Sequence, residues 1–276
     1  MPGKRSGNPP LGQSASWTTF VRMAAELLIP VVAFGASLLT FLSGFGLGTL
    51  LLPAFAVFFP LELAVVMTAF VHLLNNVFKY ATLWRHVNKR IVLLFGLPGM
   101  LGSWLGAQQL LHWSDAPALY EGVRYPVDAT RLVIGVLMAL FALLEAIPTA
   151  SQWSVPARFV PAGGLVSGFF GGLSGHQGAL RSIFLLRYGL GKEVFIATGV
   201  AIALLVDLTR IPLYVGRMDL VPWREHGLLL IGCVLAAFGG AWLGKRWLPK
   251  VTLRAVQLTV AGLLFAISAS VIAGLI

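Results

Sequence analysis

The chain has 276 residues, of which 58% are hydrophobic and 11% are charged, and its formal net charge is +10. The mean hydropathy of +0.86 lies well outside the range of soluble domains and predicts an all-α polytopic membrane protein. The positive charge does not indicate a nucleic acid as a partner, because most basic residues separate apolar runs, as they do in cytoplasmic loops and headgroup anchors.

Residues 1–22 contain Pro, Gly and Ser together with the basic pair Lys4 and Arg5. This composition predicts a disordered polar tail, and we expect no cleaved signal peptide because no small-residue cleavage site follows a short apolar core. The first apolar run then continues without a charged residue from Leu27 to Leu61. As one straight helix it would reach roughly 50 Å, against ~30 Å of hydrocarbon, so it must break or bend.

Three glycines, Gly44, Gly46 and Gly48, lie in the middle of this run, and a related Gly-rich stretch returns at 163–175. Glycine relaxes the backbone, and freed backbone is tolerated at membrane depth only where it packs inside protein or faces a cavity. Gly-interrupted apolar segments in both halves of a chain are typical of a transport site at the membrane midplane. The three glycines are therefore candidate substrate-binding residues.

We expect about eight membrane segments, most of them close to the ~20 residues that a spanning helix needs. They lie near Ala24 to Phe59, Leu63 to Leu83, Ile91 to Leu111, Arg131 to Ile147, Pro161 to Leu186, Val194 to Tyr214, Gly227 to Gly244 and Ala255 to Ile276. The predicted organisation is a polar tail over 1–22, a first transmembrane repeat over 23–148, a linker over 149–160 and a second repeat over 161–276. Each four-segment repeat opens with a Gly-broken, discontinuous helix.

Both halves place polar residues inside an apolar helix. Asn76 and Lys79 are three residues apart, as are Asp207 and Arg210. On a helix, positions i and i+3 share a face, so each pair presents polar groups to one side. Asn76 and Lys79 are candidate substrate-binding residues. His72 lies four residues before Asn76 and shares that face, although hydrogen bonding between helices is an alternative role for these polar residues.

Asp207 lies deep in its apolar run, where a lone carboxylate is costly and needs a partner or a function. Arg210, one turn away, is the expected partner. Two interpretations stay open, and they can coexist. One is a structural ion pair, and the other is a carboxylate that couples transport to protons.

Small residues recur at helical spacing in the third segment of each half, where they let helix backbones approach closely. The stripes are Gly99, Gly102, Ser103 and Gly106 in the first half, and Gly232, Ala236, Gly239, Gly240 and Gly244 in the second. The single cysteine, Cys233, lies beside the second stripe. We expect it to be a small core residue, because no disulfide partner and no metal-binding spacing accompany it.

The distribution of basic residues indicates how the segments cross the membrane. With the basic N-terminus inside, a simple up-and-down count puts residues 85–90 inside and the acidic loop 112–128 outside, as the positive-inside rule prefers. The same count puts the basic residues of 245–254 outside, which violates the rule. The violation disappears if the segment 161–186 enters and leaves on one side. We therefore expect the two repeats to be inverted relative to each other.

The second Gly-rich segment continues into a loop with candidate substrate-binding residues Ser174, Gly175, His176, Gln177 and Arg181. A half-helix N-terminus projects unpaired N–H groups, and the planar guanidinium of Arg181 suits the oxygens of a sulfonate, sulfite or carboxylate. His176 can donate a hydrogen bond or titrate. The alternatives are that Arg181 pairs with Asp207 or snorkels to a headgroup, and that His176 is a hydrogen-bonded packing residue.

These features together resemble the sulfite exporter TauE/SafE family, also called the toluene sulfonate uptake permease family. The resemblance covers roughly Leu27 to the C-terminus and rests on the first glycines followed by Pro53, the Gly-rich return at 163–175 and the two small-residue stripes. It implies secondary transport across the cytoplasmic membrane, often of sulfur-containing anions such as sulfite or organosulfonates. The second Gly-rich segment departs from the family pattern, because residues 176–182, which follow its glycines, lack the proline that is usual there.

The leading hypothesis is a multi-pass secondary transporter of the cell membrane that moves a small anion by alternating access, with protons coupled through His176 or Asp207. The expected partners are the small anionic substrate and the lipid bilayer, while homo-oligomerisation stays open. We expect no cofactor and no metal. An anion channel is the first alternative. A membrane-embedded enzyme is the second and is not expected, because no converging nucleophile and base or metal cluster occurs at membrane depth.

Overall fold

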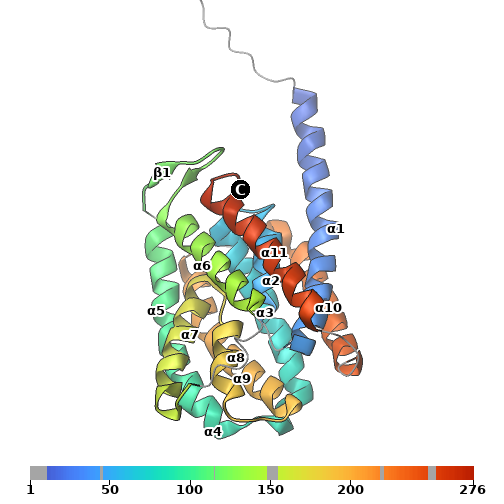
Figure 1. Ribbon diagram of the computed structural model, residues 1–276. Helices are drawn as coiled ribbons and strands as arrows, with labels where there is room; N and C mark the ends of the chain where they lie inside the picture. The colour runs from blue at the N-terminus through green and yellow to red at the C-terminus, as the bar shows by residue number, and fades with distance from the viewer. Residues whose placement is uncertain (1–10, 44–45, 115, 148–154, 218–220, 248–252) are drawn as a thin grey trace, which may run out of the picture.

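The computed structural model describes residues 11–43, 46–114, 116–147, 155–217, 221–247 and 253–276, which are mainly helical (Figure 1). The first half contains α1 (Leu11–Ser43), α2 (Gly48–Ala56), α3 (Leu61–Leu83), η1 (Trp84–His86), α4 (Lys89–Ile91), the π-helical turn η2 (Val92–Gly96), α5 (Leu97–Ser114) and α6 (Ala129–Ala146). The second half contains η4 (Ala157–Phe159), α7 (Val160–Ser174), α8 (Gly178–Leu186), α9 (Lys192–Arg217), α10 (Val221–Trp247) and α11 (Leu253–Ile272). A short hairpin of β1 (Tyr120–Glu121) and β2 (Pro126–Val127) separates α5 from α6.

Five stretches of the described helices are long and apolar enough to cross a membrane, which supports a multi-pass membrane protein. They are Met23–Thr40, Leu61–His86, Lys89–Ser114, Lys192–Gly216 and Glu225–Arg246. Shorter apolar helices, Ala129–Leu144, Val160–Ser174 and Ala261–Ile272, occupy the other three expected segments. The count of eight therefore stays a prediction. The first helix begins at Leu11, inside the range 1–22 for which we expected a disordered tail.

Both Gly-rich segments are divided into two helices. In the first half, α1 ends at Ser43 and α2 begins at Gly48, with Gly44 in the part that lies outside the described residues. In the second half, Gly175 ends α7 with a φ of 82°, a left-handed conformation that side chains other than glycine rarely adopt. After two further residues the chain starts again as α8.

The helices run between two ends of the molecule, which we name the hairpin end and the α4 end. At the hairpin end, the backbone N–H of Val123 donates to the Ala273 carbonyl (2.8 Å), which holds the β-hairpin to the last residues of the chain. Phe59, between α2 and α3, lies 4.9 Å from the ring of His226 in the first turns of α10. Figure 1 shows β1 and the C-terminus together at this end and α4 at the opposite one.

The α4 end gathers the beginning of α7 and the ends of α8 and α10. Val160 of α7 and Leu185 of α8 pack with Ile91 of α4 in one apolar cluster. Ala241, late in α10, packs with Leu83 at the end of α3 in another. The α7–α8 segment therefore enters and leaves at the α4 end. By contrast, α2 leads to the hairpin end, where α3 begins.

Helix pairing connects the two halves of the chain. Helix α1 packs along α10, α5 along α7, α3 against α9 and α6 against α11. The first two pairs are parallel, because successive contacts rise together along both helices: Pro30 with Gly232 and Phe34 with Gly240, then Gly99 with Gly164 and Gly106 with Phe169. The last two pairs are antiparallel, since α3 and α6 start from the hairpin end and α9 and α11 lead toward it. Because α1 runs parallel to α10, it also starts from the hairpin end (Figure 1).

The small-residue stripe of α5 lies against a matching stripe of α7. A Cβ added at Gly102 would lie 2.0 Å from the Leu165 carbonyl oxygen, and one added at Gly168 would lie 2.0 Å from the Gly99 carbonyl oxygen. In the α1–α10 pair, a Cβ at Gly240 would lie 2.2 Å from a carbonyl oxygen of α1. These backbones touch directly, as expected from the sequence, and helix association in a membrane depends on such packing.

Replacing Gly168 by alanine should separate α5 from α7, because the new methyl group would meet backbone atoms of α5 that cannot rotate away. We expect Gly168→Ala to destabilise the fold by about 1–3 kcal/mol, seen as a lower midpoint of thermal unfolding in fluorescence-detected size exclusion. Gly35→Ala in α1 is the matched control, since nothing lies within 4 Å of its added Cβ. Equal midpoints for the two variants would contradict this packing.

Candidate functional site

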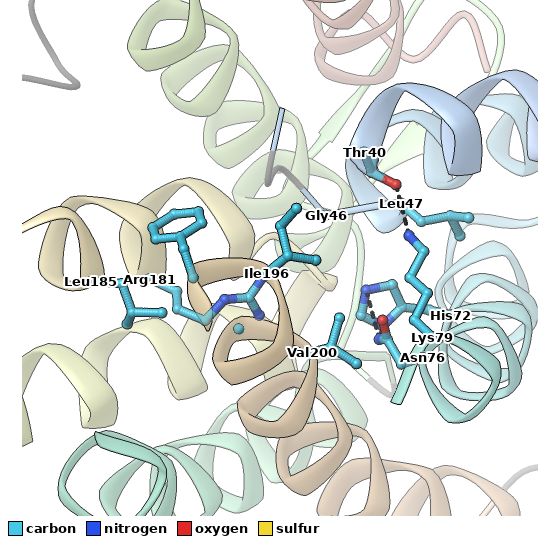
Figure 2. A pocket seen from close by; sticks show the side chains of 12 residues that line it. Thr40, Gly46, Leu47, His72, Asn76, Lys79, Arg181, Leu185, Ile196 and Val200 are labelled. Carbon is cyan, nitrogen blue, oxygen red and sulfur yellow. Dashed lines mark hydrogen bonds between the residues drawn. The ribbon is translucent and has the colours of Figure 1, made fainter. Parts of the chain in front are cut away.

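A small, mostly buried cavity lies where the two broken segments meet α3 and α9 (Figure 2). Its volume of about 30 Å³ holds roughly two water molecules. Among the described residues, the lining contains two cations, a histidine and an amide but no carboxylate. The lining residues are Thr40, Gly46, Leu47, His72, Asn76, Lys79, Arg181, Leu185, Phe195, Ile196, Gly199 and Val200.

Lys79 enters the cavity from α3, and its neighbours orient the ammonium group. Its Nζ donates to Thr40 Oγ1 at 3.1 Å. Of the two orientations of the Asn75 side-chain amide, one satisfies both of its polar atoms. In that orientation its nitrogen donates to the Ala237 carbonyl (3.2 Å), and its oxygen accepts from Lys79 Nζ (3.2 Å). Lys79 is 4% exposed, so the protein encloses a cation at this depth.

Arg181 approaches the cavity from the opposite side, in the first turn of α8 (Figure 2). It is 6% exposed, and its Nη1 has no hydrogen-bond partner among the described residues. Gly199 of α9 leaves room for the guanidinium, since a Cβ there would lie 3.3 Å from Arg181 Nε. A buried N–H without a partner is costly, which makes this group ready for an anionic ligand.

Asp207 lies beside the cavity at the centre of a buried polar cluster. Its Oδ1 accepts two hydrogen bonds from Arg210, from Nε at 3.0 Å and from Nη2 at 2.8 Å. Its Oδ2 lies 2.6 Å from His72 Nδ1 and accepts from Asn76 Nδ2 at 3.4 Å. The carboxylate thus binds the arginine expected from the sequence and also a histidine from the other half of the chain. These three side chains bond to Asp207, whereas Arg181 does not, within the part of the chain that the structure describes, so the alternative pairing of Arg181 with Asp207 finds no support in hydrogen bonds.

Arg210 also holds the end of α7. Its Nη1 donates to the Gly171 carbonyl at 2.9 Å, and the Tyr214 hydroxyl donates to the Gly172 carbonyl. The last carbonyls of a helix have no partner within the helix. The Tyr214 hydroxyl satisfies the Gly172 carbonyl, and Arg210 adds a second hydrogen bond to the Gly171 carbonyl, which also accepts from the Gly175 N–H at 3.0 Å. The Asp207–Arg210 pair therefore helps to hold the end of α7 in place at the α7–α8 break.

The glycines of the two breaks face each other. A Cβ at Gly48 would lie 3.2 Å from the Gly175 carbonyl oxygen, and one at Gly46 would lie 3.8 Å from the Gly178 nitrogen. Of the three first-half glycines predicted for substrate binding, Gly46 lines the cavity and Gly48 lies at this contact, while Gly44 is outside the described residues. The cavity is thus located directly beside the point where the breaks meet.

Four predicted site residues, Ser174, Gly175, His176 and Gln177, lie at the α7–α8 break but not in the cavity lining. The His176 ring stacks on Phe141 of α6 with centroids 5.4 Å apart, and its Nδ1 lies 3.2 Å from Ser174 Oγ. His176 Nε2 and both polar atoms of the Gln177 side chain are buried without a partner among the described residues. The substrate-binding role of these four residues stays a prediction.

Two contributors to the site were not assigned from the sequence. Thr40 and Gly199 line the cavity but lie in ordinary apolar helices, and nothing in their local sequence distinguishes them. The polar face of His72 and Asn76 was predicted, whereas the contact of His72 with Asp207 was not, since 135 residues separate them. No group of three or more His, Cys, Asp or Glu side chains suited to a metal occurs among the described residues, and Cys233 is buried in the core.

Comparison with known proteins gives one match. The family model described as "Sulfite exporter TauE/SafE" matches residues 29–271, a range that contains both broken segments and every residue that lines the cavity. No curated protein and no solved structure matches the chain. The family match spans most of the sequence, and the apolar helices agree with the membrane location that the family implies. The chain therefore belongs to the sulfite exporter TauE/SafE family of membrane transporters.

Proposed function

We propose that this protein is a secondary transporter that moves a small sulfur-containing or organic anion, of the sulfite or organosulfonate type, across the cytoplasmic membrane by alternating access. The observation that carries the proposal is the charge of the cavity. Two cationic side chains, Lys79 and Arg181, line it from opposite sides, and no carboxylate is among its described lining residues. Ionisable groups at this depth in a membrane protein usually mark a substrate path.

The chemistry of the cavity fits an oxyanion. The guanidinium of Arg181 can donate two parallel N–H groups to two oxygens of one ligand, while Lys79 supplies a compact point charge. Helix α8 adds its N-terminus, because the Arg181 N–H is the first along α8 to reach a carbonyl, that of Gln177. The N–H groups before it at the α8 start have no such carbonyl partner among the described residues, and that of Gly178 lies near Gly46, a lining residue of the cavity.

Helix pairing supports two inverted four-segment repeats. The first repeat would contain α1–α2, α3, α5 and α6, and the second α7–α8, α9, α10 and α11. A two-fold rotation that relates the repeats maps α1 onto α7 and α10 onto α5. It therefore exchanges the α1–α10 pair with the α7–α5 pair, and both pairs are parallel and packed through small residues. The same operation maps α3 onto α9 and α6 onto α11, and those pairs are antiparallel. The broken segments would then open toward opposite ends, as alternating access between repeats requires.

The charges favour one orientation of the protein in the membrane. Basic residues concentrate at the α4 end, namely Arg85, Lys89, Arg90, Arg158, Arg187, Lys192, Lys245 and Arg246. The hairpin end carries a mixed set, namely Glu62, Glu121, Arg124, Asp128 and Arg131. By the positive-inside rule the α4 end is cytoplasmic. This orientation removes the violation at 245–254, and it places the start of α1 outside, opposite to the expected cytoplasmic N-terminus.

An anion channel and a membrane enzyme are the two other candidates. His72, Asn76, Lys79 and Arg181 are each no more than 6% exposed, so the polar lining is buried, which suits the substrate site of a transporter better than a water-filled conducting pore. The family is one of transporters, which favours transport over the activity of a membrane enzyme. Saturation and coupling distinguish a transporter from a channel in an assay.

Purified protein in liposomes should take up radiolabelled sulfite or an organosulfonate, but not a carboxylate control, with saturable kinetics. Arg181→Gln should reduce uptake by about tenfold or more, because a charge-assisted pair contributes roughly 1.5–3 kcal/mol. Arg187→Gln is the matched control, since Arg187 lies at the end of the same helix, outside the cavity lining, and donates to the Val155 carbonyl. Wild-type uptake that is linear in anion concentration would identify a channel, and no uptake of any of the sulfur anions would contradict the proposed substrate class.

The inverted arrangement predicts which loops face the cytoplasm. In a Cys233→Ala background, Lys89→Cys and Lys245→Cys should react with a membrane-impermeant maleimide only after the cells are permeabilised. Val123→Cys, in the exposed β-hairpin at the opposite end, should react in intact cells. Labelling of positions 89 and 245 from opposite sides would contradict the inverted repeats.

A further inference from the structure

We propose that His72 is the proton-binding group of the transport cycle and that its proton crosses the membrane together with the anion. This inference rests on the proposed anion transport and adds its coupling site. The sequence suggested His176 or Asp207 for this role. The structure instead places His72 in both environments that a coupling group needs, since it lines the anion cavity and bonds to Asp207.

The position of His72 links the two halves of the chain. Its side chain is 3% exposed, and its Nδ1 lies 2.6 Å from Asp207 Oδ2 on α9. A carboxylate only accepts hydrogen bonds, so Nδ1 carries the hydrogen in this contact. That assignment leaves the other ring nitrogen, Nε2, as the atom that gains or loses a proton. The aspartate therefore fixes the tautomer and orientation of the ring.

Protonation of Nε2 changes what His72 offers to the cavity. In the neutral ring, Nε2 has a lone pair; Asn76 Nδ2 lies 3.3 Å from Nε2 and 3.1 Å from Nδ1, so it is not bound to Nε2 alone. In the protonated ring, Nε2 becomes a second N–H donor, and His72, which lines the cavity, can then donate to an anion there. The exchange moves one proton from water on the entry side onto Nε2 and returns it to water on the exit side, with no movement of electrons.

The charges around His72 connect proton binding with anion binding. Asp207 bonds to His72, and Arg210 on α9 shares that carboxylate through two hydrogen bonds. Lys79 on α3 and Arg181 on α8 line the same cavity as His72, and both oppose an additional positive charge. An anion between them removes this opposition. By linkage, an anion that promotes protonation of His72 is itself bound more tightly when His72 is protonated.

Asp207 is a positioning residue in this scheme, because it acts through His72 and lies outside the described cavity lining. Arg210 donates hydrogen bonds to it and to the Gly171 carbonyl at the end of α7. A purely structural role of His72, as a hydrogen bond between helices, would also require the contact with Asp207. It would not make net transport depend on a proton gradient, so the two roles differ in a measurable way.

The test compares gradient-driven uptake with exchange in proteoliposomes, using radiolabelled sulfite. In the wild type, an imposed pH gradient should drive net accumulation, and at alkaline pH, where free sulfite carries no proton, proton movement recorded by an internal pH dye should accompany uptake. His72→Gln retains a hydrogen-bond donor for Asp207 but does not titrate. It should lose the proton movement that accompanies uptake and about tenfold or more of the gradient-driven accumulation, while the sulfite–sulfite exchange that remains should be weaker, as linkage requires, and uncoupled from protons.

His86→Gln is the matched control, because His86 lies at the protein surface beside Glu193 (3.2 Å) and outside the cavity lining. It should leave both exchange and accumulation unchanged. A His72→Gln protein that accumulates sulfite as the wild type does would overturn the inference. Proton movement that still accompanies sulfite uptake in folded His72→Gln protein would also overturn it, since another group would then carry the proton.

The wild type provides a measurement that does not depend on the folding of any variant. Saturable sulfite transport without accompanying proton movement would agree with the proposed transporter function but would overturn the proton-coupling role of His72. The absence of both uptake and exchange in folded wild-type protein would instead overturn the proposed function, and with it this inference. Sulfite uptake accompanied by protons in wild type, combined with uncoupled exchange in His72→Gln, is the expected result.

Discussion

The hydrogen bonds of the buried Asp207 carboxylate are the interactions on which the rest of the site depends. The carboxylate accepts two hydrogen bonds from Arg210 and one from His72, and all three side chains are at most 3% exposed. Removing one partner of such a buried pair typically costs about 3–5 kcal/mol, because it leaves a charge without compensation. Through Arg210 the carboxylate also stabilises the end of α7, since the guanidinium donates to the Gly171 carbonyl. One acidic residue thus connects α3, α9 and the second helix break.

Local geometry was predictable from the sequence, and contacts between distant segments were not. The Asp207–Arg210 pair follows from helical periodicity, and the close packing of α5 follows from its glycines. Both are properties of one helix. The contact between His72 and Asp207 depends on the register of α3 against α9, which many packing contacts set together. The same reason explains why Arg181 of the second Gly-rich loop reaches the cavity, whereas His176, five residues earlier, stacks on α6 instead.

The two parts of the α7–α8 segment are held unequally. The C-terminal carbonyls of α7 accept hydrogen bonds from Arg210 and Tyr214, and its glycines lie in direct contact with the backbone of α5. After the break, the Gln177 side chain and Arg181 Nη1 are buried without partners among the described residues. Each such group carries a desolvation cost of about 1–3 kcal/mol in this state. A ligand or a rearrangement that gives these polar atoms hydrogen-bond partners therefore affects the start of α8 before other parts of the segment.

The glycine contacts restrict how an alternating-access cycle can proceed. Close-packed helix faces with backbone in contact resist sliding, because any shift brings a Cβ or a carbonyl into overlap. Helix α7 must then move together with α5, and α1 together with α10, so each broken segment is attached to a helix of the other half. The α3–α9 contact is different, since it is made in part by side-chain hydrogen bonds of His72 and Asn76 to Asp207, which can exchange partners. In the proposed transport cycle, motion would therefore occur between the α1–α10 pair and the α5–α7 pair rather than between the two halves of the chain, and the polar contact of α3 with α9 beside the cavity is where partners can change.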